Sequence, residues 1–420
     1  MKKLGNKISE VVEHRAKELN KLCSELIQAK SENPPGDVSE AAKVIEQFLK
    51  AEGIGYQTFE PAKGHVSVVA TVGRGKPLLI LCGHIDVVPA GDLSQWTIQP
   101  YEGVIKQGKI FGRGASDQKG GVAAMLMTLA AVKDFEDELS GKITVASVSD
   151  EEAKGPGGAL WLLQNKKLSG SACLITEPSG YLASEYSIES GERGTCWLKV
   201  TAHGKPAHAS MPVLGRNAIT LLTEFVQKLK ALESEVVAVP KEAETLVRNG
   251  KKQLRKVAKK QGVSVNSLTH TLDHYTTSLG LIKGGTKTNI VPERCEAEVD
   301  IRVPVGGNPD GVEKFVASLI PDNVEYEVIN KTLPSFTSAN HPLIEAVQQS
   351  AKQVFGYKPI ATYISATSDA HSFRELLGVP TVSFGPGYEE VCHVCNEFVY
   401  AKDVLNMAKT YANVIANFSS

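Results

Sequence analysis

Imidazole and carboxylate side chains recur in this chain directly after segments that are patterned as strands. The carboxyl ends of parallel strands meet at one edge of a sheet, so side chains that follow such strands come together in space. Imidazoles and carboxylates are ligands that suit zinc, and manganese or cobalt can take the same donors. The candidate ligands and acid-base groups are His84, Asp117, Glu151, Glu152, Glu177 and His393.

A cluster of this kind favours chemistry with two metal ions. Each oxygen of a carboxylate such as that of Asp117 can serve a different ion. Two ions about 3.5–4 Å apart can hold a hydroxide between them and polarise a carbonyl group. Any one of these carboxylates alone would be read as a surface charge, but their common position after strands indicates a site.

The elements that must position these residues follow an alternating strand and helix pattern. The run Leu78–Cys82 is apolar on both faces, as expected for a central parallel strand. Such alternation predicts an α/β layer with a mostly parallel sheet. Further strands are predicted at 66–72, 143–149, 172–176 and 381–384, and helices at 39–52, 120–133, 342–354 and 401–418.

A second pattern begins near Gly191 and interrupts the first. Its order is strand, helix, strand, strand, helix, strand, which is the ferredoxin-like α+β arrangement. The predicted elements are 195–202, 217–232, 275–282, 293–303, 311–319 and 324–329. The sequence thus predicts a catalytic domain of residues 1–192 and 331–420, and an inserted domain of residues 193–330.

Composition excludes several other classes of protein. The chain has 420 residues, a formal net charge of −1 and no apolar run long enough for a membrane span. Its seven cysteines have no framework spacing, which favours a reducing cytoplasm. The basic excursion 241–270 is interpreted as a solvated helix face, so we expect neither nucleic-acid nor membrane binding.

The motifs around these candidates resemble the dinuclear-zinc family of acetylornithine deacetylases, succinyl-diaminopimelate desuccinylases, aminoacylases and glutamate carboxypeptidases. The resemblance covers nearly the whole chain and is specific for the family rather than for a substrate. The motifs that carry it are Gly83-His84-Ile85-Asp86, Gly112-Arg113-Gly114-Ala115-Ser116-Asp117, Ser149-Asp150-Glu151-Glu152, Thr176-Glu177-Pro178, Gly204-Lys205-Pro206-Ala207-His208 and Thr286-Lys287-Thr288-Asn289.

The resemblance implies a role for each member of the cluster. Asp117 would bridge two divalent ions, zinc first and cobalt or manganese as alternatives. His84 and Glu177 would complete one site, and Glu152 and His393 the other. Asp86 would support the His84 imidazole. Glu151 would be the general base that takes a proton from water and returns it to the leaving amine.

The resemblance also implies functional residues in the inserted domain. That domain would act as a lid and would form a homodimer, and His208 would stabilise the oxyanion in the neighbouring subunit's site. Arg193, Asn289 and Arg302 would hold a substrate carboxylate. Thr367-Ser368-Asp369 would contact substrate or cap the helix that follows. In relatives, the residue after the bridging Asp is often not Gln, whereas in this chain Gln118 follows Asp117.

The predicted activity is therefore hydrolysis of the amide bond of a small N-acyl amino acid or peptide-like substrate. N-acetylornithine and N-succinyl-diaminopimelate are the expected substrates by resemblance. A metallo-dipeptidase or a glutamate-type carboxypeptidase is the alternative within the same chemistry. A non-catalytic dimeric binding relative is a third hypothesis, and the presence of Glu151 together with every candidate ligand argues against it.

Overall fold

The computed structural model describes residues 2–155, 157–181 and 185–418, and the chain divides into two compact units. Unit 1 comprises Met1–Ser190, Thr337–Thr362 and Ser368–Ser420, and unit 2 comprises Gly191–Phe336 and Tyr363–Thr367. In the short segment 363–367 of unit 2, the Tyr363 hydroxyl donates a 2.6 Å hydrogen bond to the carbonyl of Glu192. The predicted domain boundaries, 192/193 and 330/331, stay a prediction; the units divide at 190/191 and 336/337, and segment 363–367, which was predicted in the catalytic domain, clusters with unit 2.

Unit 1 is built on a mixed sheet whose central strands are parallel. The strands β6, β3, β7 and β16 are parallel to one another, whereas β2 pairs antiparallel with β1 and β6, and β9 pairs antiparallel with β16. The order is β1 (Tyr56–Phe59), β2 (Ser67–Val72), β6 (Lys142–Val148), β3 (Pro77–His84), β7 (Ala172–Tyr181), β16 (Thr381–Tyr388) and β9 (Ile188–Glu192). The predicted α/β class with a mostly parallel sheet is confirmed.

Shorter strands complete the sheets of the chain. β8 (Glu185–Tyr186) pairs with β7, and β14 (Ser335–Phe336) and β15 (Ala361–Ile364) pair with β9. A separate small sheet contains β4 (Ile105–Lys106), β5 (Lys109–Phe111) and β17 (Phe398–Tyr400). The sequence did not predict β1 or this small sheet, because strands of two to four residues leave too short a periodic pattern.

The helix α4 (Gly120–Lys133) forms the buried centre of the helical layer in unit 1. Every residue from Gly120 to Val132 is buried, which fits a helix that is apolar on all sides. It packs against α1, α2, α12 and the strands β3, β6 and β7. The other helices are α1 (Lys2–His14), α2 (Ala16–Gln28), α3 (Ser39–Ala51), α5 (Ala159–Gln164), α10 (Pro342–Phe355), α11 (Ala370–Ser372) and α12 (Ala401–Phe418).

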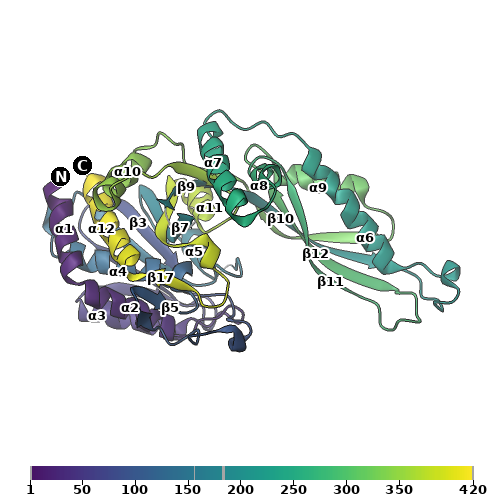
Figure 1. Ribbon diagram of the computed structural model, residues 1–420, viewed down its shortest axis with the longest axis horizontal. Helices are drawn as coiled ribbons and strands as arrows, with labels where there is room; N and C mark the ends of the chain where they lie inside the picture. The colour runs from purple at the N-terminus through teal and green to yellow at the C-terminus, as the bar shows by residue number, and fades with distance from the viewer. Residues whose placement is uncertain (1, 156, 182–184, 419–420) are drawn as a thin grey trace. The chain divides into compact units, whose positions relative to one another are not determined.

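The two ends of the described chain meet in unit 1. The first helix α1 and the last helix α12 lie side by side, as Figure 1 shows. The Asn413 amide of α12 donates a 2.9 Å hydrogen bond to the Ser9 hydroxyl of α1. The C-terminal part of the sequence therefore returns to the unit that the N-terminal part began.

Unit 2 has the predicted ferredoxin-like arrangement. Its four-stranded sheet is antiparallel, in the order β11 (Thr276–Gly284), β12 (Arg294–Val303), β10 (Gly194–His203) and β13 (Val324–Thr332). The helices α6 (Ala218–Leu229) and α9 (Pro309–Leu319) pack against this sheet. The second predicted architecture is thus confirmed as well.

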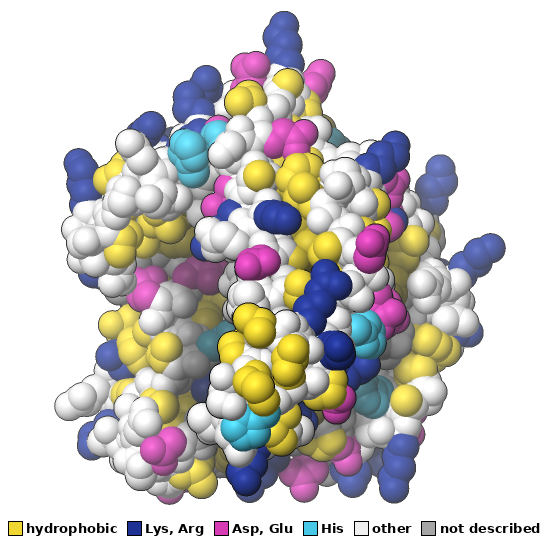
Figure 2. Space-filling view, turned by 90° about the vertical axis from the view of Figure 1, so that its right-hand side faces the viewer, with side chains coloured by type: hydrophobic (Ala, Val, Ile, Leu, Met, Phe, Trp, Pro, Cys, Tyr) yellow, Lys and Arg dark blue, Asp and Glu magenta, His cyan; other side chains and the backbone are white. Residues whose placement is uncertain are grey.

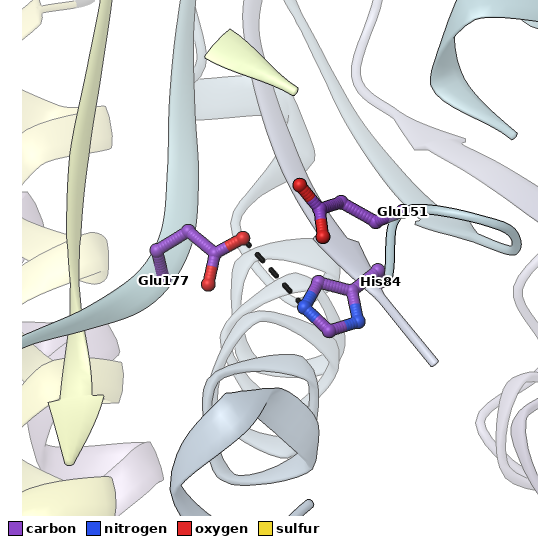
Figure 3. Close-up of side chains that lie close together, drawn as sticks. All are labelled: His84, Glu151 and Glu177. Atoms are coloured by element: carbon purple, nitrogen blue, oxygen red, sulfur yellow. Dashed lines mark ion pairs between the residues drawn. The ribbon is translucent and has the colours of Figure 1, made fainter. Parts of the chain in front are cut away.

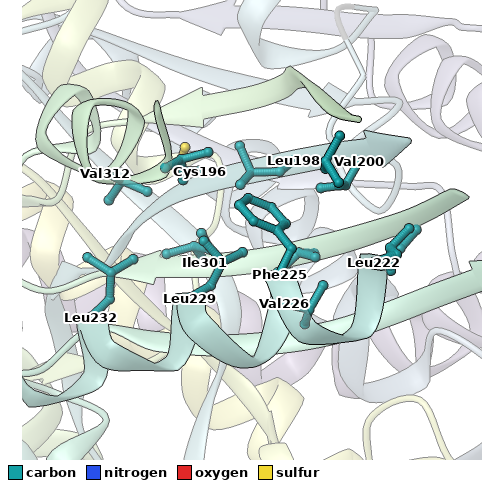
Figure 4. Packing of buried hydrophobic residues seen from close by; sticks show 14 of the residues in the cluster. Cys196, Leu198, Val200, Leu222, Phe225, Val226, Leu229, Leu232, Ile301 and Val312 are labelled. Carbon is teal, nitrogen blue, oxygen red and sulfur yellow. The ribbon is translucent and has the colours of Figure 1, made fainter. Parts of the chain in front are cut away.

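The core of unit 2 lies between this sheet and its helices. Along β12, residues alternate between buried and more exposed positions, which is the pattern of a sheet with one covered face. Phe225 and Leu229 of α6 pack against Leu198, Val200 and Ile301 of the strands (Figure 4). The excursion between α6 and β11 forms α7 (Glu244–Gln261) and α8 (Val265–His270), and Arg248, Lys252, Arg255 and Lys259 of α7 are exposed.

Candidate active site

His84 is the last residue of β3, and close packing beneath it holds this strand end in place. Gly83 precedes it, and a Cβ atom at Gly83 would lie only 2.5 Å from the Thr176 Oγ1 of β7 and 2.9 Å from the Gln118 Oε1. Thr176 in turn donates a 2.7 Å hydrogen bond to Gln118. The polar ends of β3 and β7 and the segment after Asp117 therefore meet at one point.

Asp117 lies between the two predicted imidazole ligands. Its Oδ1 is 3.0 Å from His84 Nε2, and its Oδ2 is 3.0 Å from His393 Nε2. Each imidazole also faces a second carboxylate: Glu177 Oε1 is 3.6 Å from His84 Nε2, and Glu152 Oε2 is 3.4 Å from His393 Nε2. The five predicted ligands thus form one group, with Asp117 in the middle.

These spacings fit the donor set of a zinc-type ion. Two ligand atoms about 2.0–2.1 Å from one ion, at a tetrahedral angle, lie about 3.3 Å apart. The four distances, 3.0, 3.6, 3.0 and 3.4 Å, lie on both sides of that value. Two sets of potential ligand atoms each lie within 4.8 Å of one another, namely His84, Glu151 and Glu177, and His84, Asp117 and Glu152.

The strand β7 differs from its predicted extent. The sequence pattern ended it at Thr176, directly before Glu177, whereas β7 continues to Tyr181. The reason is continued pairing, since Pro178 and Gly180 of β7 are in register with Gly385 and Tyr388 of β16. Glu177 therefore lies on an extended strand rather than on a turn, which holds its backbone more firmly.

The electrostatics of the group show an excess of buried negative charge. Burial raises the pKa of Glu152 to about 7, with a further contribution from Asp117, and burial also raises the pKa of Glu177. Burial opposes the ionisation of Asp117, but hydrogen bonds from His393 and His84 outweigh it and hold its pKa well below the usual range. Divalent cations stabilise such carboxylates strongly.

The two imidazoles respond to the same carboxylates. Hydrogen bonds to Asp117 and Glu152 raise the pKa of His393 to about 10. Burial disfavours the charged form of His84, but the charge of Glu177 and the hydrogen bond to Asp117 raise its pKa above the ordinary value. Positive charge is therefore favoured at both imidazoles, which is the charge that a bound cation would bring.

The Asp86 carboxylate is fully buried and holds three parts of the site together. It accepts hydrogen bonds from the backbone N–H groups of Glu151 (3.2 Å) and Glu152 (3.1 Å). Its Oδ1 lies 3.5 Å from His84 Nδ1, and that nitrogen is 2.9 Å from the Asp86 carbonyl oxygen. Asp86 thus holds the His84 ring through its carbonyl oxygen and the turn that carries the two glutamates through its carboxylate.

Glu151 lies near His84 and Glu177, and the ion pairs described above for His393 do not include it. Figure 3 shows the carboxylates of Glu151 and Glu177 both directed toward the His84 ring. Lys154 Nζ lies 3.8 Å from Glu151 Oε1. The neighbouring Asp150 has φ 67°, and this left-handed turn lets adjacent residues face different directions.

Sequence reasoning missed two residues that support this turn. Asn33 Nδ2 donates to Asp86 Oδ2 (2.9 Å) and to Asp150 Oδ1 (3.1 Å), so it joins two buried carboxylates. Asp150 also accepts a 2.9 Å hydrogen bond from the N–H of Gly157. Asn33 has no distinctive signal in the sequence, because its contact with Asp86 exists only in the folded chain.

The other predicted residues of the inserted domain lie in unit 2. His208 and Asn289 are exposed and adjacent, since the Ala209 N–H donates to the Asn289 carbonyl (3.0 Å) and His208 forms a β-bridge with Ile290. The His208 Nδ1 lies 2.6 Å from the Ser210 hydroxyl. The two side chains therefore occupy one exposed loop region of unit 2.

The two predicted arginines are engaged within unit 2. Arg193 is buried, and its guanidinium donates to Thr276 Oγ1 and to the carbonyls of His274 and Arg302. Arg302 Nε donates to both carboxylate oxygens of Asp300 at 2.9 Å, and its Nη1 donates to Thr367 Oγ1 at 3.1 Å. Their role in binding substrate stays a prediction.

The segment that follows Thr367 begins a short helix in unit 1. The Ser368 hydroxyl accepts a 3.2 Å hydrogen bond from the N–H of Ala370, so it caps α11. Burial, followed by the charge of Glu151, raises the pKa of Asp369 to about 8. The sequence offered capping and substrate contact for this segment, and the observed hydrogen bond is a capping contact.

The fold and the grouped ligands define a class of protein, the metal-dependent hydrolases that act on amide or peptide bonds. Among known families, the profile of peptidase family M20/M25/M40 matches residues 80–417 of this chain. The chain therefore belongs to peptidase family M20/M25/M40, and the resemblance predicted from the motifs is confirmed.

Curated relatives are similar over nearly the full length of both chains. A probable succinyl-diaminopimelate desuccinylase of Staphylococcus epidermidis is 27% identical over 402 residues, which cover 94% of this chain and 96% of that protein. A succinyl-diaminopimelate desuccinylase of Sulfurovum sp. is 27% identical over 403 residues, covering 95% and 98%. These names describe the relatives, and at this identity they do not fix the substrate of this chain.

Solved structures share the fold at lower identity. An M20 family metallo-carboxypeptidase from Sulfolobus solfataricus has a TM-score of 0.82 at 21% identity, with 96% of this chain and 99% of that chain covered. A di-peptidase from Saccharomyces cerevisiae has a TM-score of 0.82 at 16% identity, with 100% and 99% covered. A dinuclear metal binding peptidase of Bacillus subtilis has a TM-score of 0.63 at 16% identity, with 96% and 98% covered.

Proposed function

We propose that this protein is a two-metal amidohydrolase that cleaves the amide bond of a small N-acyl amino acid. The observation that carries the proposal is the position of Asp117, whose two oxygens each face a different imidazole at 3.0 Å. Each imidazole has its own second carboxylate, Glu177 for His84 and Glu152 for His393. This arrangement suits two ions that share Asp117.

The ions are proposed to be zinc, with cobalt or manganese as alternatives, because the donors are imidazole nitrogen and carboxylate oxygen. His84 and Glu177 would hold one ion, Glu152 and His393 the other, and Asp117 both. When bound, the ions would polarise the substrate carbonyl and lower the pKa of water.

The remaining steps are assigned to side chains of the chain itself. Glu151 takes the proton from the attacking water and delivers it to the amine nitrogen as the amide bond breaks. Asp86 keeps the His84 ring and the Glu151 backbone in register through the contacts described above. His208, supplied by a second copy of the chain, would donate a hydrogen bond to the oxyanion of the tetrahedral intermediate.

The substrate is proposed to carry a free carboxylate on its amino-acid part. Arg302 and Asn289 are the assigned partners, with Arg193 as a third candidate. Of these, Asn289 is exposed and Arg302 is partly exposed, whereas Arg193 is buried with both terminal nitrogens already bonded. We therefore expect Arg302 and Asn289 to contribute more than Arg193.

Within this reaction class, succinyl-diaminopimelate or acetylornithine is the proposed substrate, since the curated relatives above are named as desuccinylases. A dipeptidase or carboxypeptidase activity is the second candidate, because solved structures with the same fold are titled as such. Both candidates use the same water attack on an amide carbonyl. The two candidates differ in the chemical group to which that carbonyl carbon belongs.

The experiment is a substrate panel with the purified full-length protein, first stripped of metal and then loaded with zinc, cobalt or manganese. N-succinyl-diaminopimelate, N-acetylornithine, dipeptides and peptides that end in glutamate separate the candidates. Failure to hydrolyse any amide with any of the three metals would refute the proposal.

The matched variants are Glu151→Gln and, as a control, Glu40→Gln on the exposed surface of α3. We expect the first to lower kcat by about 10²–10⁴-fold, the usual contribution of a general base, while two metals still bind. The control should retain wild-type activity. Near-normal turnover by Glu151→Gln would show that another group is the base.

We also propose a homodimer formed through unit 2. β11 is an edge strand of its sheet and exposes Leu279, Leu281 and Ile282, an arrangement that monomers avoid because it invites strand pairing. Hydrophobic side chains also gather on the face of the molecule in Figure 2, and Val213 and Leu214 are exposed as well.

Light scattering should give the mass of a dimer for the wild type and of a monomer for Leu281→Lys. Val263→Lys, at an exposed apolar position between α7 and α8, is the matched control and should stay dimeric. A monomeric wild type would contradict the proposal.

A cytoplasmic location is proposed from the cysteines: all seven, each within the described ranges, are free. Across the part of the chain that the structure describes, no helix combines the length and the hydropathy that a membrane crossing requires.

A further inference from the structure

Glu397 is a buried carboxylate whose hydrogen bonds all go to the segment that carries Asp117. Its side chain is about 1% exposed. Its Oε1 accepts hydrogen bonds from the backbone N–H groups of Ser116 (2.9 Å) and Asp117 (3.1 Å). Its Oε2 accepts from the N–H of Gly114 (3.0 Å) and from Arg113 Nη1 (2.7 Å). Four donors thus converge on one carboxylate.

These donors depend on Glu397 because of where they lie in the fold. The segment precedes α4 and is irregular, with Gly114 at φ +82° and Asp117 outside helical geometry. The N–H groups of Gly114, Ser116 and Asp117 lie ahead of α4, so the hydrogen bonds within α4 give them no partner. A buried N–H without a partner costs about 1–3 kcal/mol. The Glu397 carboxylate satisfies three such groups and so fixes the path of the backbone into Asp117.

Arg113 extends this connection to the segments around the other candidate ligands. Its Nη1 also donates to the carbonyl of Val394 (3.2 Å), which directly follows His393. Its Nη2 donates to the carbonyl of Pro89 (3.4 Å), in the segment that follows β3. Its guanidinium lies 5.3 Å from the Trp96 ring. The buried Arg113–Glu397 ion pair therefore joins the three segments that carry His84, Asp117 and His393.

Resting on the function proposed above, we infer that Glu397, through Arg113, is a positioning residue that sets the orientation of Asp117 relative to His393. Glu397 has no contact with the reacting atoms. It follows His393 closely in sequence, and it accepts a 3.1 Å hydrogen bond from the Asp117 N–H. The carboxylate thereby couples the bridging ligand to the segment of the most exposed ligand, His393, whose side chain is 54% exposed.

A purely structural role for this ion pair makes a different prediction. Breaking a buried ion pair lowers stability by about 3–5 kcal/mol in general. Such a loss leaves metal affinity unchanged at temperatures where the protein stays folded. Positioning instead changes metal affinity and the geometry around the ions, since residues that orient ligands typically contribute 10- to 100-fold. Metal affinity therefore separates the two roles.

The test is cobalt binding to the metal-free full-length protein, measured by calorimetry and by visible absorption well below the unfolding temperature. For Glu397→Gln we expect cobalt affinity to fall by about 10- to 100-fold, with an altered absorption spectrum. The kcat should fall by a similar factor while KM changes less than about threefold. Arg113→Lys, which keeps the charge but loses the two-nitrogen fork, should give the same changes at smaller size.

The matched control is Glu52→Gln, which breaks the partly buried ion pair between Arg15 and Glu52 elsewhere in unit 1. It should lower the unfolding temperature without changing cobalt affinity or spectrum. If Glu397→Gln has the cobalt affinity and absorption spectrum of the wild type, the inference is overturned. If Glu397→Gln does not fold, wild-type affinity and spectrum in Arg113→Lys would overturn it instead. A wild type that binds no cobalt would remove the proposed two-metal function and the inference with it.

Discussion

The substitution Asp86→Asn tests whether one buried carboxylate organises the active site. Asp86 accepts hydrogen bonds from Glu151 N, Glu152 N and Asn33 Nδ2, and it lies beside His84 Nδ1. Every group that faces this carboxylate is a donor. An asparagine of the same shape keeps one acceptor oxygen, but its NH₂ group must then face a donor.

The magnitude follows from the number of bonds lost. Hydrogen bonds to a charged group contribute about 1.5–3 kcal/mol each. If the amide nitrogen takes the place of Oδ1, the bond to Glu151 N is lost and the remaining bonds lose their charge. A loss of about 2–3 kcal/mol at the base and at His84 corresponds to a decrease of about 30- to 150-fold in kcat. Metal affinity should fall in parallel, because the His84 ring keeps its bond to the Asp86 carbonyl but loses the carboxylate charge 3.5 Å from its Nδ1.

The assay is steady-state hydrolysis of the best substrate at saturating metal, together with metal affinity by calorimetry. Asp403→Asn is the matched control, since Asp403 Oδ2 accepts hydrogen bonds from the hydroxyls of Tyr186 and Tyr388. That variant should lose stability but keep its kcat. A kcat within threefold of the wild type for Asp86→Asn would refute the reasoning.

Three further outcomes are expected. Burial holds the pKa values of Glu152 at about 7 and Asp369 at about 8, above their unfolded values, so folding favours their neutral forms. The metal-free protein should therefore lose stability as pH rises from 5 to 7, and its Tm should fall by a few degrees. Bound zinc should make this fall in Tm smaller. A Tm that stays constant or rises over this pH range would contradict the prediction. Gly83→Ala should cost about 1–3 kcal/mol in urea unfolding and lower kcat, because its Cβ would meet the Thr176 hydroxyl; unchanged unfolding would be against it. Phe225→Ala should destabilise unit 2 by about 3–5 kcal/mol while cobalt affinity stays unchanged, and a loss of affinity would show that the metal site depends on this core.

Much of the fold followed from local periodicity. The helix α4 was predicted with its observed bounds, since thirteen buried residues in succession leave a strong apolar signal. The four unit 2 strands were predicted within a few residues, because alternation along a half-covered sheet is visible in the sequence. The short strands β1, β5 and β17 were missed, since their pairing depends on residues far away in the chain.

The candidate site likewise contains residues that the sequence predicted and residues that it did not. The ligand types and their positions after strands predicted a metal group, and the motifs predicted the family. The supporting residues Asn33, Asp150, Arg113 and Glu397 were not assigned. An Asn in a turn or an Arg–Glu pair has no distinctive signal in a sequence, because its function lies in which buried atoms it meets.

The sequence by itself determined which chemistry this protein can perform, because side-chain type decides what can bind a metal ion or carry a proton. It also determined the two architectures, since apolar periodicity selects strands and helices locally. Only the tertiary structure decided that the two oxygens of Asp117 face different imidazoles, and that Asp86 and Glu397 hold the surrounding segments. Those contacts join residues that are distant in the chain, and their geometry is set by the packing of the whole sheet rather than by any local pattern.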